Sequence, residues 1–196
     1  NLITKVDVLI VGGGMANTFL LADGHDIGAS LVEADMIDTA KAIREQAAAI
    51  GCRFILPQDG VVATAFAANA PHRLVHFAND HIADNEMILD AGRDAVAIIS
   101  AEIDDCRTLI WNGPMGAFEI EPFDQATTAL AQYVASRTEA GTLISVAGGG
   151  DTIAALNHAN VLDQFSYVST AGGAFLEWLE GRNLPGAAAL MKQNKS

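Results

Sequence analysis

The sequence predicts an α/β fold in which a six-stranded, mainly parallel sheet carries helices on both faces. Short runs rich in β-branched and other apolar residues alternate along the chain with longer segments of helical periodicity. Most of the short runs are nearly continuous in apolar residues, as expected of parallel strands that are buried on both faces. Three of them lead directly into glycines and then into a helical segment. Together these observations indicate a Rossmann-like three-layer sandwich.

The individual elements follow from local patterns. Six runs are expected to form the sheet: residues 6–12, 53–57, 87–90, 107–111, 142–147 and 165–169. Two less regular β runs, residues 61–65 and 73–77, are expected to pair separately. Helices are expected at residues 35–50, 93–103 and 122–137, where apolar residues recur along one stripe. Gly51 follows the first of these helices and is typical of a helix stop.

The composition limits the possible functions. The 196 residues suit one large domain or two small ones. A net charge of −13 argues against a surface for nucleic acid or for an anionic membrane, because both need clustered lysine and arginine. No apolar run is long enough to cross a bilayer. Cys52 and Cys106 lack metal-ligand spacing and fit a reduced, cytoplasmic setting. The chain opens without Met or a signal-peptide pattern, so we expect a fragment.

Glycine-rich turns follow three of the expected strands, at residues 12–14, 148–150 and 172–173. Since the carboxyl ends of parallel strands meet at one edge of a sheet, the three turns are expected at that edge. Glycine lets a ligand approach the main chain, and the following helix offers unpaired N–H groups and a positive dipole end. The three turns together predict a site for a polyphosphate or nucleotide. Helix–strand packing alone could explain any single turn.

The second turn is followed by Asp151, for which two interpretations are open. Its carboxylate could cap the helix, or it could meet a metal ion carried by phosphates. Standard nucleotide motifs do not decide the matter, because GxxxxGK[ST] is absent and GxGxxG fails at Asn17 and at Ile153. Glu33 lies at a plausible spacing for a ribose contact, which is thin support for NAD. An NAD-dependent oxidoreductase domain and a non-catalytic binding domain therefore stay open.

Five motifs, in order along the chain, resemble one family. VLIVGGGMANTFL, MILDAG, LIWNGPMGAFE, SVAGGGDTIAAL and SYVSTAGGAFLEWLEGRNLPG are together similar to the C-terminal, nucleotide-binding half of phosphoglycerate kinase. The resemblance implies that residues 1–196 form that domain, and that an N-terminal domain binding 3-phosphoglycerate is absent from this chain. It also implies reversible phosphoryl transfer between 1,3-bisphosphoglycerate and Mg-ADP, giving 3-phosphoglycerate and Mg-ATP. In this family the two domains close over the substrates and exclude water.

The resemblance also implies roles for individual residues. Gly12 and Gly13 match the turn beside the adenine, and Leu89 matches an apolar contact to it. Glu119 matches the carboxylate that binds the ribose hydroxyls, and Asn112 matches a residue near the terminal phosphates. The phosphate turn is matched by Gly149, Gly150, Asp151 and Thr152, with Asp151 as the Mg²⁺ contact. Three glycines are implied to face the transferred phosphoryl group: Gly150, Gly172 and Gly173.

Some features depart from the family pattern. Arg93 stands where the family commonly has proline, and Ala117 replaces the usual valine. A lysine-bearing segment of AKVxxK type and the glycerate-binding half are missing. Lys5 precedes the first strand, at the edge opposite the glycine turns, so catalytic cations are expected from outside this chain. We therefore expect this chain to bind Mg-ADP weakly and to be inactive alone, and the full-length protein to be a cytoplasmic monomer.

Overall fold

The computed structural model describes residues 2–169, which form five α-helices, three short 3₁₀ helices and eight strands. The α-helices are α1 (Gly13–Ala22), α2 (Ile37–Ile50), α3 (Arg93–Asp104), α4 (Gln125–Glu139) and α5 (Gly150–His158). The strands are β1 (Val8–Ile10), β2 (Arg53–Ile55), β3 (Asp59–Ala63), β4 (His72–His76), β5 (Met87–Ala91), β6 (Thr108–Trp111), β7 (Ile144–Gly148) and β8 (Tyr167–Ser169). The 3₁₀ helices are η1 (Leu2–Thr4), η2 (Ala34–Met36) and η3 (Leu162–Gln164).

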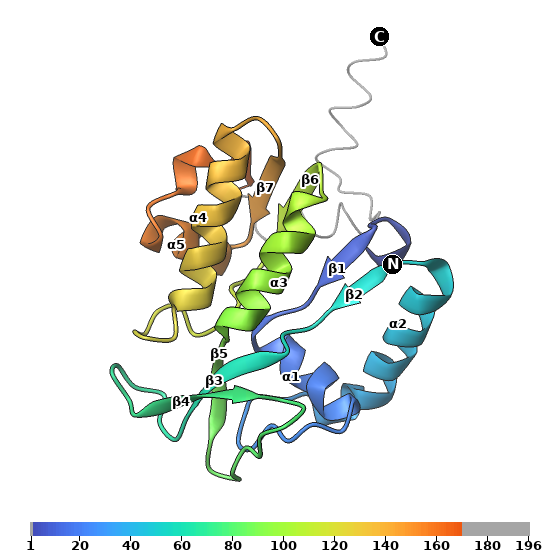
Figure 1. Ribbon diagram of the computed structural model, residues 1–196, viewed down its shortest axis with the longest axis vertical. Helices are drawn as coiled ribbons and strands as arrows, with labels where there is room; N and C mark the ends of the chain where they lie inside the picture. Colours follow the sequence, from blue (N-terminus) through green and yellow to red (C-terminus); the bar gives the residue numbers. More distant parts are fainter. Residues whose placement is uncertain (1, 170–196) are drawn as a thin grey trace.

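The α/β class is confirmed, but the strands do not form one six-stranded sheet. β1 pairs in parallel with β2, and β6, β7 and β8 form a second parallel sheet. The third sheet has the order β4-β3-β5 and is antiparallel throughout. Figure 1 shows α1 and α2 beside β1 and β2, and α4 and α5 beside β7. Residues 61–65 and 73–77 were thus correctly expected to pair apart from the parallel strands.

The direction of β5 is where the sequence-based prediction is wrong. Residues 87–90 were expected in the parallel sheet, yet β5 pairs antiparallel with β3, with Gly60 opposite Ala91 and Ala63 opposite Met87. A short apolar run shows that a strand is buried but not which way its neighbour runs. The neighbour β3 decides the direction here.

The edge strands β1 and β6 of the two parallel sheets lie on either side of one cavity. Arg53 N donates to Asp7 O (2.9 Å) and Val11 N donates to Ile55 O (3.0 Å), so alternate residues of β1 bond to β2. The backbone groups of Val8 and Ile10 therefore point away from β2. In β6 the same alternation turns Thr108 and Ile110 away from β7, since Ile144 N donates to Arg107 O. These four residues lie along a cavity of about 1520 Å³.

The largest apolar core lies between α3, α4, α5 and the β6–β8 sheet. Leu130, Val134 and Leu156 are each at most 2% exposed within it. A Leu→Ala change at such a site costs about 2–5 kcal/mol of stability. This core packs α4 and α5 against the sheet, and α5 begins at the edge where β7 ends.

Two predicted helix boundaries are explained by their termini. α2 ends as expected at Gly51, whose φ of +78° is left-handed. α3 begins at Arg93 directly after its N-cap Gly92. The first helical position also accepts proline, so Arg93 leaves this helix start unchanged.

Candidate functional site

Residues 112–119, here called the central loop, follow β6 at its carboxyl end and join the elements around them. Gly13 N donates to Met115 O at 3.1 Å, which ties the loop to the turn before α1. Met115 N donates to Thr127 Oγ1 of α4 at 3.0 Å. Ala117 N donates to Leu89 O of β5 at 2.8 Å. The central loop therefore fixes the first glycine turn, β5 and α4 relative to one another.

The first glycine turn packs against this loop. Gly13 has a φ of +59°, and a Cβ built on it would lie 2.9 Å from Pro114 O. A Cβ on Gly12 would lie 2.5 Å from Met115 Sδ. The space beside both glycines is thus taken by protein atoms. Close helix–loop packing accounts for these two glycines without any ligand.

The second glycine turn differs in being open at one residue. Gly149 has a φ of +97°, and a Cβ on it would lie 2.7 Å from Asn112 Oδ1. A Cβ on Gly150 would meet no atom of residues 2–169 within 4 Å. Gly150 is the first residue of α5, and the N-cap residue Gly149 makes no side-chain capping bond to that helix. Free N–H groups beside open space are what an approaching anion requires.

Asp151 is exposed in the first turn of α5. The N-cap is Gly149, so the interpretation of Asp151 as the capping residue is wrong. Within residues 2–169, no group of three or more His, Cys, Asp and Glu side chains could hold a metal ion. A single carboxylate at this place fits Mg²⁺, which keeps several waters and is held by one or two carboxylates plus substrate phosphates.

Thr152 turns its hydroxyl into the protein. The residue is 1% exposed, and its Oγ1 accepts a hydrogen bond from Gly113 N at 2.6 Å. The hydroxyl thus ties the start of α5 to the central loop. Through Thr152 and Asn112, the second glycine turn joins the same assembly as the first.

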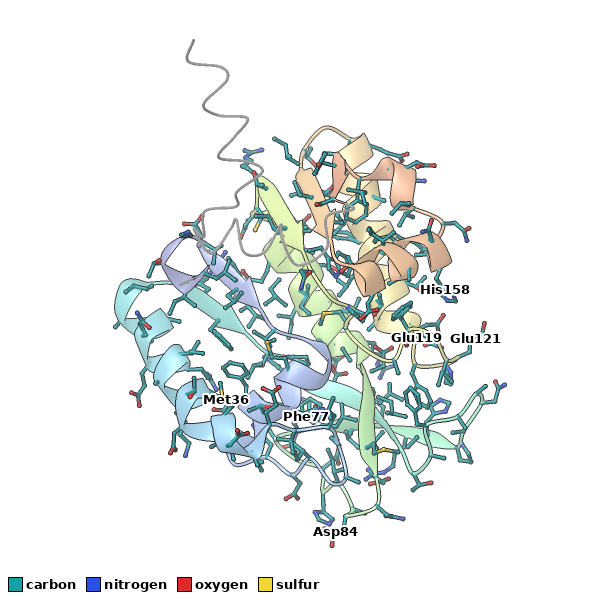
Figure 2. The ribbon with its side chains drawn as sticks, turned by 180° about the vertical axis from the view of Figure 1, so that it is seen from behind. Met36, Phe77, Asp84, Glu119, Glu121 and His158 are labelled. Atoms are coloured by element: carbon teal, nitrogen blue, oxygen red, sulfur yellow. The ribbon has the colours of Figure 1, made fainter. Side chains whose placement is uncertain are left out.

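Leu89 of β5 contacts the central loop, and Glu119 is the last residue of that loop. Leu89 is 9% exposed and packs with Ala63, Ala70 and Phe123. Glu119 is exposed on the segment that leads into α4, and Figure 2 shows it close to Glu121 at the same end of the molecule as His158. His158 Nε2 lies 2.8 Å from Asp124 Oδ2, which joins α5 to the start of α4.

The cavity between β1 and β6 gathers four of the expected residues: Gly12, Gly13, Leu89 and Asn112. Residues 149–152 and Glu119 do not line it. Gly172 and Gly173 lie outside the described residues.

Sequence reasoning missed three apolar residues of this cavity. Met15 is 67% exposed, Leu31 is 78% exposed and Phe66 is 58% exposed. Exposed large apolar side chains in a cavity point to ligand contact. The sequence offers no signal for them, because exposure is a property of the folded chain.

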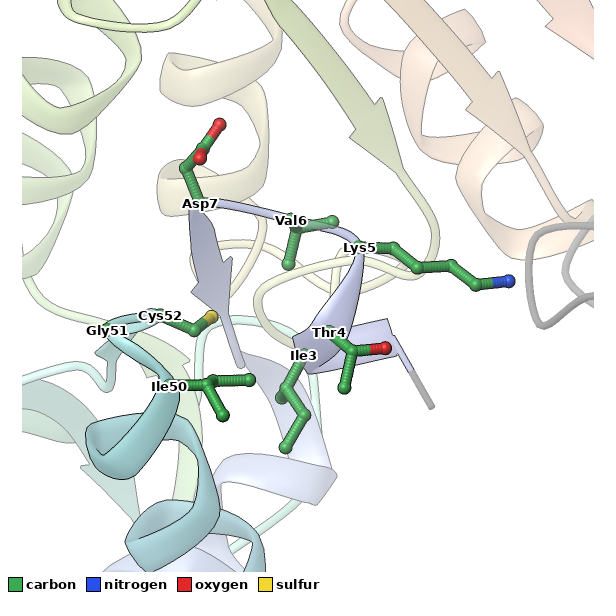
Figure 3. A pocket seen from close by; sticks show the side chains of 8 residues that line it. All are labelled: Ile3, Thr4, Lys5, Val6, Asp7, Ile50, Gly51 and Cys52. Carbon is green, nitrogen blue, oxygen red and sulfur yellow. The ribbon is translucent and has the colours of Figure 1, made fainter.

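A second concavity, of about 530 Å³, lies at the amino end of β1 (Figure 3). It is lined by Ile3, Thr4, Lys5, Val6, Asp7, Ile50, Gly51 and Cys52. Figure 3 shows the Lys5 side chain directed away from the other labelled residues. Since Lys5 comes before β1, the structure places it at the edge opposite the glycine turns at residues 12–14 and 148–150, as expected.

The positively charged side chains around the larger cavity also belong to residues at the amino ends of strands. Among residues 2–169, the lysine and arginine residues that line it are Lys5, Arg53 and Arg107, and each comes shortly before a strand or at its first residue. Among the described lining residues, none at the carboxyl end carries a positive charge.

The phosphoglycerate kinase family model matches residues 1–182. The chain belongs to the phosphoglycerate kinase family. It is 59% identical over 192 residues to phosphoglycerate kinase of Xanthobacter autotrophicus, covering 98% of this chain and 48% of that protein. It is 60% identical over 190 residues to phosphoglycerate kinase of Methylobacterium radiotolerans, covering 97% of this chain and 47% of that protein.

Solved phosphoglycerate kinase structures show the same fold. The structure from Coxiella burnetii has a TM-score of 0.87 and 48% identity, covering 92% of this chain and 46% of that chain. The structure from Pyrococcus horikoshii has a TM-score of 0.73 and 25% identity, covering 96% of this chain and 46% of that chain. The chain spans about half the length of these phosphoglycerate kinases. Family membership favours a kinase over an NAD-dependent oxidoreductase.

Proposed function

We propose that this chain is the C-terminal, nucleotide-binding half of a phosphoglycerate kinase, and that Mg-ADP and Mg-ATP bind at its glycine turns. The observation that carries the proposal is the open space at Gly150, beside the uncapped start of α5. Asn112 and Asp151 lie at the same edge, one beside Gly149 and the other following Gly150. An anionic ligand would meet free N–H groups, an amide and a carboxylate there.

Different residues would bind different parts of the nucleotide. Met15, Leu31 and Phe66 offer exposed apolar surface for the base, and Glu119 offers a carboxylate for the ribose hydroxyls. The start of α5 would hold phosphate oxygens with its N–H groups, with Asn112 beside them. Asp151 would hold Mg²⁺ together with the phosphates, and the metal would supply positive charge that offsets theirs.

In the proposed reaction a phosphoryl group moves from the carboxyl oxygen of 1,3-bisphosphoglycerate to the terminal phosphate oxygen of ADP. The acceptor in the reverse direction is the carboxylate of 3-phosphoglycerate. Such a transfer depends on alignment and on positive charge around the moving group. The described residues at the carboxyl edge of the cavity supply alignment but no cation. We infer that this chain alone binds nucleotide and does not turn over substrate.

The cavity between β1 and β6 supports the proposal that another part of a longer protein completes the site. The backbone groups of Val8, Ile10, Thr108 and Ile110 line it, and Ile110 is 42% exposed. An extended segment lying between the two strands could pair with both. Its carboxyl end would then emerge between the first glycine turn and the central loop. The proposed protein is a cytoplasmic monomer whose other half binds 3-phosphoglycerate.

Within residues 2–169, no helix combines the length and the apolar character needed to cross a bilayer.

Calorimetric titration with ADP tests the proposed function. We expect saturable binding that strengthens when Mg²⁺ is present, and tighter binding by the full-length Xanthobacter autotrophicus relative than by this chain. NADH serves as the control ligand. Tight NADH binding without ADP binding would overturn the proposal in favour of an oxidoreductase domain.

A further inference from the structure

Asp90 carries a buried carboxylate that the proposed nucleotide contacts do not use. It lies on β5 and is 2% exposed. Its Oδ1 accepts a hydrogen bond from Ala91 N at 2.9 Å, and its Oδ2 accepts one from Ala126 N at 2.9 Å. Burying a carboxylate destabilises the folded state unless the carboxylate is hydrogen-bonded, so both bonds stabilise the fold.

The bond to Ala126 caps α4 from outside that helix. The N-cap residue of α4 is Asp124, and its own side chain makes no capping bond. The Asp124 carboxylate is instead paired with His158 of α5. Because the first N–H groups of a helix have no partner within it, Asp90 supplies an acceptor that α4 otherwise lacks.

The same carboxylate also supports the central loop. A Cβ built on Gly116 would lie 2.2 Å from Asp90 Oδ1 and 2.7 Å from Leu89 O. The loop backbone therefore rests directly on β5, where Ala117 N donates to Leu89 O. Asp90 thus contacts both ends of the segment that carries Glu119, at Gly116 and at Ala126.

We propose that Asp90 is a positioning residue of the nucleotide site, which holds the central loop and the start of α4 on β5. The proposal rests on the nucleotide-binding function proposed above. Asp90 acts through Glu119 and the central loop, without touching the nucleotide. Loss of its carboxylate would loosen the loop and weaken nucleotide binding.

Asp59 provides a matched control on the neighbouring strand. It lies on β3, is 1% exposed, and its carboxylate accepts hydrogen bonds from Asp94 N (3.1 Å) and Ala95 N (2.7 Å) at the start of α3. Like Asp90, it is therefore a buried carboxylate on the antiparallel sheet that caps a helix. None of the proposed nucleotide contacts lies on α3, so Asp59→Asn reproduces the stability loss without the effect on the site.

The test compares Asp90→Asn with Asp59→Asn in amide hydrogen exchange and in Mg-ADP titration. We expect Asp90→Asn to speed the exchange of the Met115 and Ala117 amides and to weaken Mg-ADP binding about tenfold, the scale of one lost hydrogen bond to a charged group. Asp59→Asn should leave both near wild type. Equal effects of the two substitutions on loop exchange and on binding would overturn the proposal.

Two further measurements test the proposal if Asp90→Asn does not fold or if wild type does not bind ADP. If Asp90→Asn fails to fold, Gly116→Ala displaces the loop from Asp90 by the clash described above. It should weaken Mg-ADP binding while the Ala126 amide stays protected, and unchanged binding would contradict the proposal. If wild type binds no ADP, the nucleotide function fails, but the exchange of the loop amides still tests the positioning role of Asp90.

Discussion

Thr152 Oγ1 accepts a hydrogen bond from Gly113 N at 2.6 Å, and this contact joins the start of α5 to the central loop. The two residues are 39 positions apart in sequence. The open turn at Gly150 and the amide of Asn112 flank this contact, so the bond sets how the proposed phosphate site is aligned.

Thr152→Val removes this acceptor and leaves the half-buried Gly113 N–H without this partner. We expect a loss of about 1–3 kcal/mol in the free energy of unfolding, together with weaker ADP binding. Thr138→Val is the control, because the Thr138 hydroxyl bonds to Val134 O of α4 and Ser145 Oγ of β7, which are not among the proposed nucleotide contacts. Denaturant unfolding and calorimetry should show stability loss in both variants but weaker ADP binding only in Thr152→Val. An unchanged ADP affinity in Thr152→Val would mean that this hydrogen bond does not align the proposed phosphate site.

Gly150→Ala places a methyl group where the structure leaves open space. The chain should fold as before and gain up to about 1 kcal/mol in stability, because alanine restricts the unfolded chain. ADP affinity should fall, since the methyl group occupies the approach to the α5 N–H groups. Calorimetry on the two proteins checks this outcome. If Gly150→Ala binds ADP with the affinity of wild type, the phosphates bind at another place.

Asp151→Asn removes the carboxylate that we propose as the Mg²⁺ contact. Binding of Mg-ADP should fall toward the affinity for metal-free ADP, whereas binding of metal-free ADP should change little. Asp163→Asn, an exposed carboxylate at the start of η3, is the control and should leave both affinities unchanged. Parallel losses with and without Mg²⁺ in Asp151→Asn would mean that this carboxylate does not contact the metal.

The buried carboxyl of Asp90 predicts a dependence of stability on pH. Burial raises its pKa from 3.8 to about 7, and the Asp124 carboxylate adds to the rise. Between these two values the folded chain holds one more proton than the unfolded chain. Its free energy of unfolding should therefore decrease as the pH rises through this window. Denaturant unfolding across the window should show this slope in wild type and in Asp59→Asn, and a flatter slope in Asp90→Asn. An identical slope in all three would assign the titration to another group.

The sequence was sufficient for features that depend on local pattern. The helix stop at Gly51, the β–glycine–helix turns before α1 and α5, and the separate pairing of residues 61–65 and 73–77 all follow from spacing and residue type. The placement of Lys5 at the amino edge followed from its position before β1. Each of these properties is set by a few consecutive residues.

Properties that depend on contacts between distant segments could not be predicted. The direction of β5 is set by its pairing with β3, and the inward hydroxyl of Thr152 is set by Gly113. Gly12 and Gly13 carry the same sequence signal as Gly150, yet only Gly150 faces open space. The exposure of Leu31 and Phe66 depends on how the loops that carry them are placed.

The proposed function depends on the binding of nucleotide phosphates at the start of α5, beside the central loop. Its most direct test is a titration of the chain with Mg-ADP, followed through the backbone amide signals by NMR. We expect the signals of Gly150, Asp151 and Asn112 to shift to saturation, and those of Ile50, Gly51 and Cys52 at the opposite edge to stay in place. Saturable shifts confined to the opposite edge, or spread evenly over the chain, would contradict it.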